Sequence, residues 1–277
     1  WIATAQNCRM NMLRVWGGGI YEREVFYREC DRRGILVWQD FMFSCSSYPD
    51  FDPGFMANVR AEVVHVVKAL RNHPSLALWC GNNEIQWLHG QKLAELTDMR
   101  LYGERIFHEL IPELLGALDP TRLYWPSSPF GGNDPNSEEE GDKHNWQVWA
   151  GQVYPHRYGE PVRIDNTPAG TSFKNYTRDL GKFISEFGIQ AAPVRRTLQS
   201  CLPPAALSPD SFSLRYRNKD KHPDRGKLLM QSFTGLPKNF DEYIDYSMLT
   251  QAEGLKFGIE HYRRRKPDCS GTLIWQL

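Results

Sequence analysis

The chain has 277 residues, enough for one large domain or two small ones, and an α/β barrel typically needs about 250 residues. Its 33 Lys and Arg residues balance its 33 Asp and Glu residues. A formal net charge of zero argues against a nucleic-acid or anionic-membrane partner, which normally leaves a basic excess. No apolar run approaches the roughly 20 residues that cross a bilayer, so we expect no membrane span.

The cysteines and histidines indicate neither a disulfide framework nor a metal site. None of the six cysteines forms a C-x-x-C pair, and 41% hydrophobic residues let a chain of this size build a core without covalent crosslinks. The eight histidines lack H-E-x-x-H or any other ligand spacing. We therefore predict reduced thiols, no bound metal and no cofactor.

Seven short apolar runs predict strands. Most are nearly continuous in apolar character, as strands buried on both faces are. In chain order they are Met12–Trp16, Ile35–Trp38, Leu76–Cys80, Leu123–Trp125, Trp146–Trp149, Phe183–Ser185 and Thr272–Trp275.

Helical patterns alternate with these runs, over Tyr21–Arg33, Phe55–Arg71, Leu93–Leu118 and Ser247–Arg265. Gly34 predicts a left-handed cap for the first, and Pro74 ends the second because the residue before proline avoids helical angles. Two stretches, Pro126–Lys143 and Leu202–Lys227, predict long loops. The acidic run Glu138-Glu139-Glu140 in the first of these is expected to be a solvated loop face.

Strand and helix alternating this often predict parallel βαβ units and an α/β fold. The strand candidates number seven, and Trp1 opens on what reads as a helix already under way. If the fold is an eight-stranded barrel, its first strand lies before residue 1. We therefore expect residues 1–277 to be one barrel domain that is incomplete at its N-terminus.

Two glutamates follow buried strands in matching settings, Glu84 after Leu78-Trp79-Cys80-Gly81-Asn82-Asn83 and Glu186 after Phe183-Ile184-Ser185. Catalytic groups of α/β barrels lie at the C-terminal ends of strands. Two carboxyl groups facing each other are what glycoside hydrolysis needs, one as acid and the other as nucleophile or base. The alternative for either glutamate alone is a strand-end acid paired with a neighbouring Arg or Lys.

Aromatic residues supply candidate sugar contacts, because indole faces pack on the C–H faces of a pyranose. Trp16 and Trp275 stand last in their runs and are expected at the mouth, whereas Trp38 is expected in the core. His144, just before Trp146, is the histidine that we expect near the site. The run Gly17-Gly18-Gly19 lacks a Walker lysine and a following helix start, so it predicts a flexible loop rather than a phosphate cradle.

At these residues the sequence resembles the β-mannosidases of glycoside hydrolase family 2. Met10–Glu22 resembles their second barrel strand, Leu36–Phe43 with Tyr48-Pro49 the third, His73–Glu84 the fourth, Ser185–Gly188 the seventh and Gly271–Leu277 the eighth. The resemblance spans nearly the whole chain in the family's order.

The resemblance implies a (β/α)₈ TIM barrel that lacks its first strand here and removes terminal β-linked mannose with retention of configuration. It implies Glu84 as general acid/base, Glu186 as nucleophile and Asn83 near the 2-hydroxyl of the substrate. Trp16, Trp146 and Trp275 align with aromatic residues that line the sugar pocket. The flanking β-sandwich domains of the family have no counterpart in residues 1–277.

Two alternatives stay open on the sequence alone. The first is a related family 2 hydrolase acting on another β-glycoside, such as a glucosaminide, a galactoside or an internal β-mannoside. The second is a truncated barrel that binds sugar without hydrolysing it. The expected partner is in each case a β-linked sugar, with no nucleic acid and no membrane.

Overall fold

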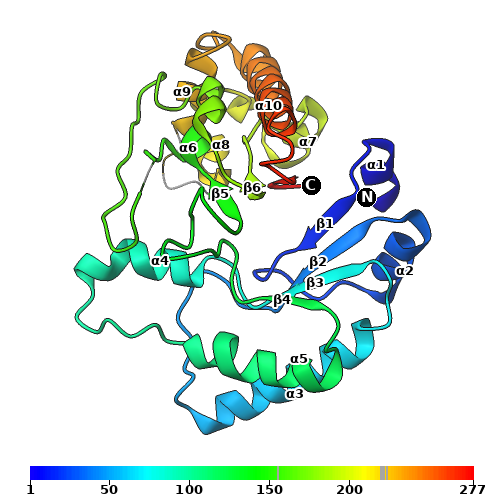
Figure 1. Ribbon diagram of the computed structural model, residues 1–277. Coiled ribbons are helices and arrows are strands. Elements are labelled where there is room, and N and C mark those ends of the chain that lie inside the picture. Colours follow the sequence, from blue (N-terminus) through cyan, green and yellow to red (C-terminus); the bar gives the residue numbers. More distant parts are fainter. Residues whose placement is uncertain (155, 219–221, 223) are drawn as a thin grey trace. The chain divides into compact units, whose positions relative to one another are not determined.

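The computed structural model describes residues 1–154, 156–218, 222 and 224–277. The chain divides into two compact units, each described here by itself: Trp1–Lys143 with Arg157–Pro161 and Leu277, and His144–His156 with Val162–Gln276. Both combine strands with helices (Figure 1). Across the described residues, no helix is long and apolar enough to cross a membrane. The predicted α/β class with parallel strand pairing is confirmed.

The first unit is built on a four-stranded parallel sheet with strand order β1-β2-β3-β4. These strands are β1 (Met12–Val15), β2 (Leu36–Asp40), β3 (Leu76–Cys80) and β4 (Leu123–Trp125). All four were predicted, β3 and β4 with the same bounds. Parallel pairing brings the C-terminal ends of the strands to one edge, where the polar residues after each strand can meet.

The helical segments of this unit are α1 (Ile2–Asn7), α2 (Glu24–Arg33), α3 (Pro53–Leu70), α4 (Ile85–Lys92), η1 (Leu93–Glu95), η2 (Ile106–Leu110) and α5 (Ile111–Leu118). The apolar stripe of α3, from Val59 to Leu70, is buried in one core with strand residues such as Val37 and Trp79. Gly34 ends α2 in a left-handed conformation with φ of 66°, as predicted.

The predicted single helix over Leu93–Leu118 is wrong. Helical structure stops after η1 and resumes only near η2. The fully buried carboxylate of Asp50 explains the interruption, because it accepts hydrogen bonds from the Arg100 Nη2 at 2.9 Å and the Arg105 backbone N–H at 3.2 Å. These bonds hold the connecting segment in a turn, with Gly103 at φ of 104°.

The predicted loop after β4 is organised by a buried carboxylate. Asp142 accepts hydrogen bonds from Trp125 Nε1 at 2.7 Å, from the Ser128 hydroxyl at 2.6 Å and from the Phe130 backbone N–H at 2.9 Å. The acidic run is only partly a solvated face, because Glu138 pairs at 2.5 Å with the buried Lys143 ammonium.

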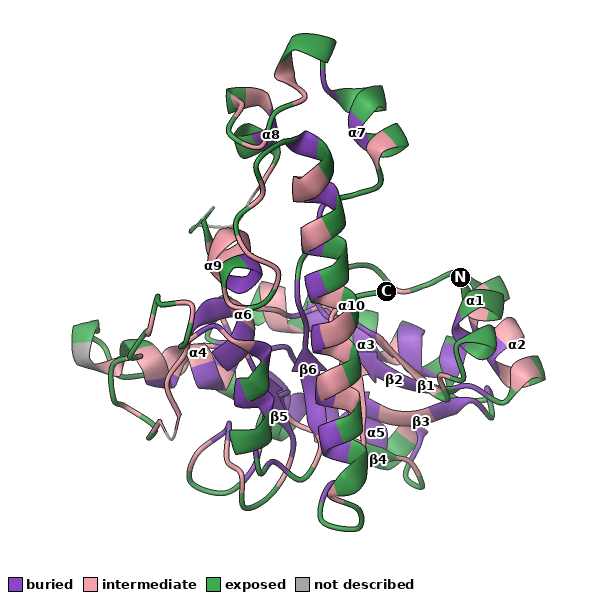
Figure 2. Cartoon of the chain, turned by 90° about the horizontal axis from the view of Figure 1, so that it is seen from above, coloured by how far each residue is buried: buried purple, intermediate pink, exposed green. Residues whose placement is uncertain are grey.

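The second unit carries a sheet of strand order β5-β6-β7, with β5 (Lys143–Asn145), β6 (Ile184–Phe187) and β7 (Thr272–Ile274). β6 and β7 are parallel, with Ile184 opposite Thr272 and Phe187 opposite Ile274. All residues of β6 are buried, whereas buried and exposed positions alternate along α10 (Phe240–Arg264) (Figure 2). The described strands thus number seven as predicted, in two sheets rather than one.

The fifth strand lies three residues before its predicted position at Trp146–Trp149. That segment contains α6 (Gln147–Ala150), with Trp146 at its N-cap. The side chain of Asn145, which accepts from the Gln147 backbone N–H at 3.1 Å, turns the chain out of β5 and into this helix.

The other helical segments of the second unit are η3 (Phe173–Arg178), α7 (Arg195–Cys201), η4 (Pro204–Ala206), α8 (Phe212–Arg217) and α9 (Arg225–Gln231). The stretch 202–227 is therefore not one long loop, although residues 219–221 and 223 lie outside the described residues. α10 begins before the predicted Ser247, because Asn239 caps it by accepting from the Glu242 backbone N–H at 2.9 Å. All six cysteines are free, as predicted.

Candidate active site

Glu84 lies just beyond β3 at the start of α4, in a backbone conformation that is unusual for glutamate. Its φ of 60° and ψ of 6° are left-handed, which costs a residue other than glycine about 1–3 kcal/mol. The Glu84 N–H donates to the Ser128 carbonyl at 2.8 Å, and its carbonyl accepts from the Leu88 N–H at 2.9 Å. These bonds hold Glu84 in a strained conformation, which is a frequent property of functional residues.

The side chain of Asn82 performs the capping role in place of Glu84. Its Oδ1 accepts from the Ile85 backbone N–H at 3.1 Å and from the Ser127 hydroxyl at 2.8 Å. Asn82 thus accepts from the first N–H of α4, and the carboxylate of Glu84 makes no capping hydrogen bond to its own helix.

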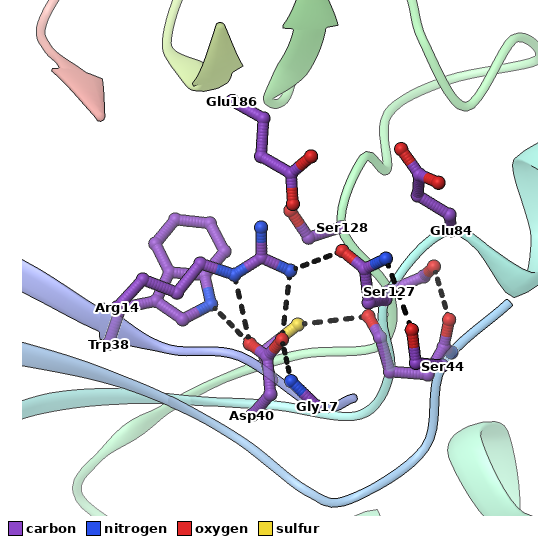
Figure 3. A network of polar contacts seen from close by, with 12 residues as sticks. Arg14, Gly17, Trp38, Asp40, Ser44, Glu84, Ser127, Ser128 and Glu186 are labelled. Carbon is purple, nitrogen blue, oxygen red and sulfur yellow. Dashed lines mark hydrogen bonds and ion pairs between the residues drawn. The ribbon is translucent and has the colours of Figure 1, made fainter. Parts of the chain in front are cut away.

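Asn83 is buried, and its amide is oriented by the ion pair of Arg14 and Asp40, which Figure 3 shows. Arg14 Nη2 donates to Asn83 Oδ1 at 2.8 Å. The Asn83 Nδ2 then faces Ser44 Oγ and Cys45 Sγ, each 3.4 Å away. Since guanidinium groups only donate, the contact with Arg14 determines which end of the amide faces which neighbour.

Arg14 is itself held by the fully buried carboxylate of Asp40. Arg14 Nε and Nη2 reach Asp40 Oδ1 and Oδ2 at 3.2 and 2.8 Å, a bidentate pair. Trp38 Nε1 donates to Oδ1 at 2.9 Å and the Gly17 N–H to Oδ2 at 3.0 Å. Trp38 is buried as predicted, and four donor atoms satisfy the Asp40 charge.

Trp16 directly follows β1 and leads into the glycine run, which is not simply a flexible loop. A Cβ on Gly17 would lie 2.5 Å from the Phe43 carbonyl oxygen, and one on Gly18 would lie 2.0 Å from the Trp16 ring. These glycines therefore permit close packing, which fixes the chain beside Trp16.

Cys45 is a residue that sequence reasoning missed. Its Sγ lies 3.7 Å from Glu84 Oε2, and its backbone N–H donates to the Asn83 carbonyl at 2.9 Å. A signal was available, since Cys45 follows β2 and the ends of adjacent parallel strands lie side by side. Desolvation of the sulfur, followed by the negative charge of Glu84, raises the pKa of the Cys45 thiol above its ordinary value.

In the second unit, β6 positions Glu186 and β5 positions His144. Glu186 is 4% exposed and His144 is fully buried. His144 Nδ1 lies 3.3 Å from Glu186 Oε2, so the ring can donate to this carboxylate when Nδ1 carries the proton. Two of the predicted site residues are thus in direct contact.

Trp275 follows β7 and lies beside the segment that follows Glu186. The Trp275 N–H donates to the Phe187 carbonyl at 2.9 Å, and a Cβ on Gly188 would lie 2.0 Å from the Trp275 carbonyl oxygen. Trp146 begins α6 two residues after His144. The end of β5 is held in place by Asn145, which lies between His144 and Trp146. Its amide donates to the buried Asp179 carboxylate and, at 3.3 Å, to the Tyr262 hydroxyl.

Of the predicted residues, Trp16, Asn83 and Glu84 therefore belong to the first unit. His144, Trp146, Glu186 and Trp275 belong to the second. Within each unit, the glutamate is accompanied by a polar partner, Cys45 for Glu84 and His144 for Glu186. Each unit can therefore present one carboxyl group that contacts a neighbouring side chain.

Comparison with known proteins gives matches along the whole chain. No model of a protein family matches it. The chain is 32% identical to β-mannosidase B of Thermothelomyces thermophilus, over all of this chain and 33% of that protein. It is similar in structure to the β-D-mannosidase of Dictyoglomus thermophilum, with 42% identity and a TM-score of 0.88 over 99% of this chain and 32% of that one.

The exo-chitosanase CsxA of Amycolatopsis orientalis shares the fold, with a TM-score of 0.64 at 15% identity. At this identity the likeness concerns the fold alone. The chain spans about a third of the length of the curated relatives that it matches. The resemblance to β-mannosidases seen in the motifs is confirmed over the full chain.

Proposed function

We propose that this chain, a relative of the β-mannosidases along its whole length, forms the catalytic part of a retaining exo-β-mannosidase. The observation that carries the proposal is the match of nearly the whole chain to a β-D-mannosidase at 42% identity. The two candidate carboxyl groups agree with it, because one follows β3 and the other lies in the C-terminal half of β6.

The fold that we propose for residues 1–277 is a single (β/α)₈ barrel domain without its first strand. Four strands with intervening helices pair in parallel in the first unit, and β6 and β7 do so in the second. β1 is a terminal strand of the first sheet, and β7 is a terminal strand of the second.

In the proposed mechanism, the Glu186 carboxylate attacks the anomeric carbon while the Glu84 carboxyl group gives its proton to the departing glycosidic oxygen. The C–O bond to the aglycone breaks and a mannosyl ester on Glu186 forms. Water then attacks the same carbon, Glu84 takes its proton and the ester bond breaks. Two inversions give net retention, for which carboxyl groups stand about 5–5.5 Å apart.

The side chains around the glutamates supply the proposed sugar contacts. Asn83, with its amide oriented by Arg14, is proposed to contact the 2-hydroxyl. Trp16, Trp146 and Trp275 are proposed to line the sugar site with their ring faces. His144, whose Nδ1 lies 3.3 Å from Glu186 Oε2, is proposed to limit rotation of the nucleophile and to face the substrate.

A panel of nitrophenyl β-glycosides tests the proposal, with the mannoside, glucosaminide, galactoside and glucoside compared on the intact protein. We expect hydrolysis of the β-mannoside at the highest kcat/KM, with β-mannose appearing first in the proton NMR spectrum. Preference for another glycoside would overturn the sugar assignment. First appearance of α-mannose would overturn retention, and mannose binding without turnover would indicate a sugar-binding barrel.

A further inference from the structure

The thiol of Cys45 is in contact with both Asn83 and Glu84, which follow β3. Its Sγ lies 3.4 Å from Asn83 Nδ2, 3.2 Å from Ser44 Oγ and 3.7 Å from Glu84 Oε2. The first two groups donate to sulfur, whereas the carboxylate accepts. The arrangement therefore leaves the S–H proton to point at Glu84.

The direction of the Cys45 side chain is fixed by its backbone. Cys45 has φ of 52°, a left-handed conformation that is rare for residues other than glycine. Its N–H donates to the Asn83 carbonyl at 2.9 Å, and the Asn83 N–H donates to the Phe43 carbonyl at the same distance. These two bonds pair the chain after β2 with the chain after β3, and they keep the sulfur beside the carboxylate.

Core packing does not explain this cysteine, because Cys45 is exposed, unlike Cys30, Cys80 and Cys269. The residue is exposed, but desolvation of its sulfur, followed by the negative charge of Glu84, raises the pKa of the Cys45 thiol above its ordinary value. A protonated thiol is a weak hydrogen-bond donor, whereas a thiolate would repel the carboxylate.

We propose that Cys45 is a positioning residue for Glu84, which holds the carboxyl group through an S–H hydrogen bond and links it to the amide of Asn83. The connection runs from Asp40 through Arg14 and Asn83 to Cys45 and Glu84. A buried ion pair thereby sets the direction of the acid/base. This inference rests on the proposed function, since it concerns the proton donor of that reaction.

The first test compares Cys45→Ala and Cys45→Ser with Cys8→Ala, an exposed cysteine of the same unit. We expect Cys45→Ala to lower kcat/KM about tenfold for a β-mannoside with a poor leaving group and less than about twofold for the dinitrophenyl β-mannoside, which needs little protonation. Cys45→Ser keeps a donor and should recover most of the loss. Cys8→Ala should match the wild type.

The second test does not depend on turnover. In Glu84→Gln the negative charge beside the sulfur is gone, so the thiolate fraction of Cys45 should rise. We expect iodoacetamide to alkylate Cys45 several-fold faster in Glu84→Gln than in the wild type at pH 8, with Cys8 unchanged. Mass spectrometry of the peptides measures both rates, and circular dichroism establishes that the variants are folded.

An unchanged alkylation rate of Cys45 in Glu84→Gln would overturn the proposal, because the two groups would then not interact. Equal losses on both substrates, or Cys45→Ser no better than Cys45→Ala, would also overturn it while leaving the mannosidase function intact. If the wild type hydrolyses no β-mannoside, the proposed function fails by itself. The alkylation rates then still decide whether Cys45 and Glu84 are coupled.

Discussion

Arg14 and Asn83 are joined by a hydrogen bond of 2.8 Å between the guanidinium Nη2 and the amide Oδ1, although they are 69 residues apart in the chain. The same guanidinium makes a bidentate pair with Asp40, which is fully buried. The amide next to Glu84 is therefore oriented by a charge pair at the ends of β1 and β2. Stability and site geometry depend on the same side chains.

Replacing Arg14 with Met should lower the free energy of unfolding by about 3–5 kcal/mol, because the buried Asp40 carboxylate loses its counter-charge. Urea denaturation measures this change. Arg60→Met provides the control, since Arg60 and Glu113 form an exposed pair at 3.0 Å that should contribute about 0–1 kcal/mol. Equal effects of the two substitutions would show that the Arg14–Asp40 pair is not the stabilising contact that its burial indicates.

Much of the fold can be predicted from short-range sequence patterns. The apolar runs of β3 and β4 have the predicted bounds, and Gly34 ends α2 because a left-handed residue is needed there. The fifth strand was predicted at Trp146–Trp149 because of its two tryptophans. The strand ends before them, because the Asn145 side chain starts a turn there. The break in the predicted helix from Leu93 depends on Asp50, which is distant in sequence and invisible to periodicity.

The candidate site, too, can be predicted from the sequence only in part. Glu84 follows the apolar strand β3 and Glu186 lies near the end of the apolar strand β6, so the sequence alone offers both as candidates. The connection from Asp40 through Arg14 to Asn83 requires the register of β1 and β2, in which Arg14 lies opposite Trp38. No spacing along the chain reveals that register. Cys45 was likewise missed, because its importance lies in a contact between two strand ends.

Gly188→Ala should displace the Trp275 backbone, because the new Cβ would lie 2.0 Å from the Trp275 carbonyl oxygen. Backbone atoms give way with difficulty, so we expect destabilisation of about 1–3 kcal/mol, together with a raised KM if Trp275 lines the sugar site. Thermal unfolding and steady-state kinetics measure these two effects.

The control for this substitution is Gly226→Ala in α9, where a Cβ would meet nothing within 4 Å. Alanine at a helical glycine should leave stability unchanged or raise it by up to about 1 kcal/mol. If both substitutions left stability and KM as in the wild type, the close approach of Gly188 and Trp275 would be refuted.

Glu186→Ala should abolish turnover, and azide should restore it with formation of α-mannosyl azide. The small anion occupies the space left by the carboxylate and attacks the anomeric carbon from that side, so one inversion replaces two. NMR of the product reports its configuration. Glu260→Ala, at an exposed position of α10, should behave as the wild type. Near-normal turnover of Glu186→Ala without azide would remove Glu186 from the role of nucleophile.

Glu84→Gln should affect substrates according to their leaving groups. Without a proton donor, kcat/KM for a poor leaving group should fall by about 10²–10⁴, whereas an activated dinitrophenyl mannoside should form the mannosyl ester at nearly the normal rate. Its kcat should still fall, because no base activates the water that breaks the ester. Azide needs no base, so it should raise kcat for the dinitrophenyl substrate.

The azide product separates the roles of the two glutamates. In Glu84→Gln, azide attacks the ester on Glu186 from the side where water normally enters, so the product should be β-mannosyl azide, opposite in configuration to that from Glu186→Ala. Glu109→Gln at an exposed position should match the wild type on both substrates. An α-mannosyl azide from Glu84→Gln, or equal loss of kcat/KM on both substrates, would mean that Glu84 is not the acid/base.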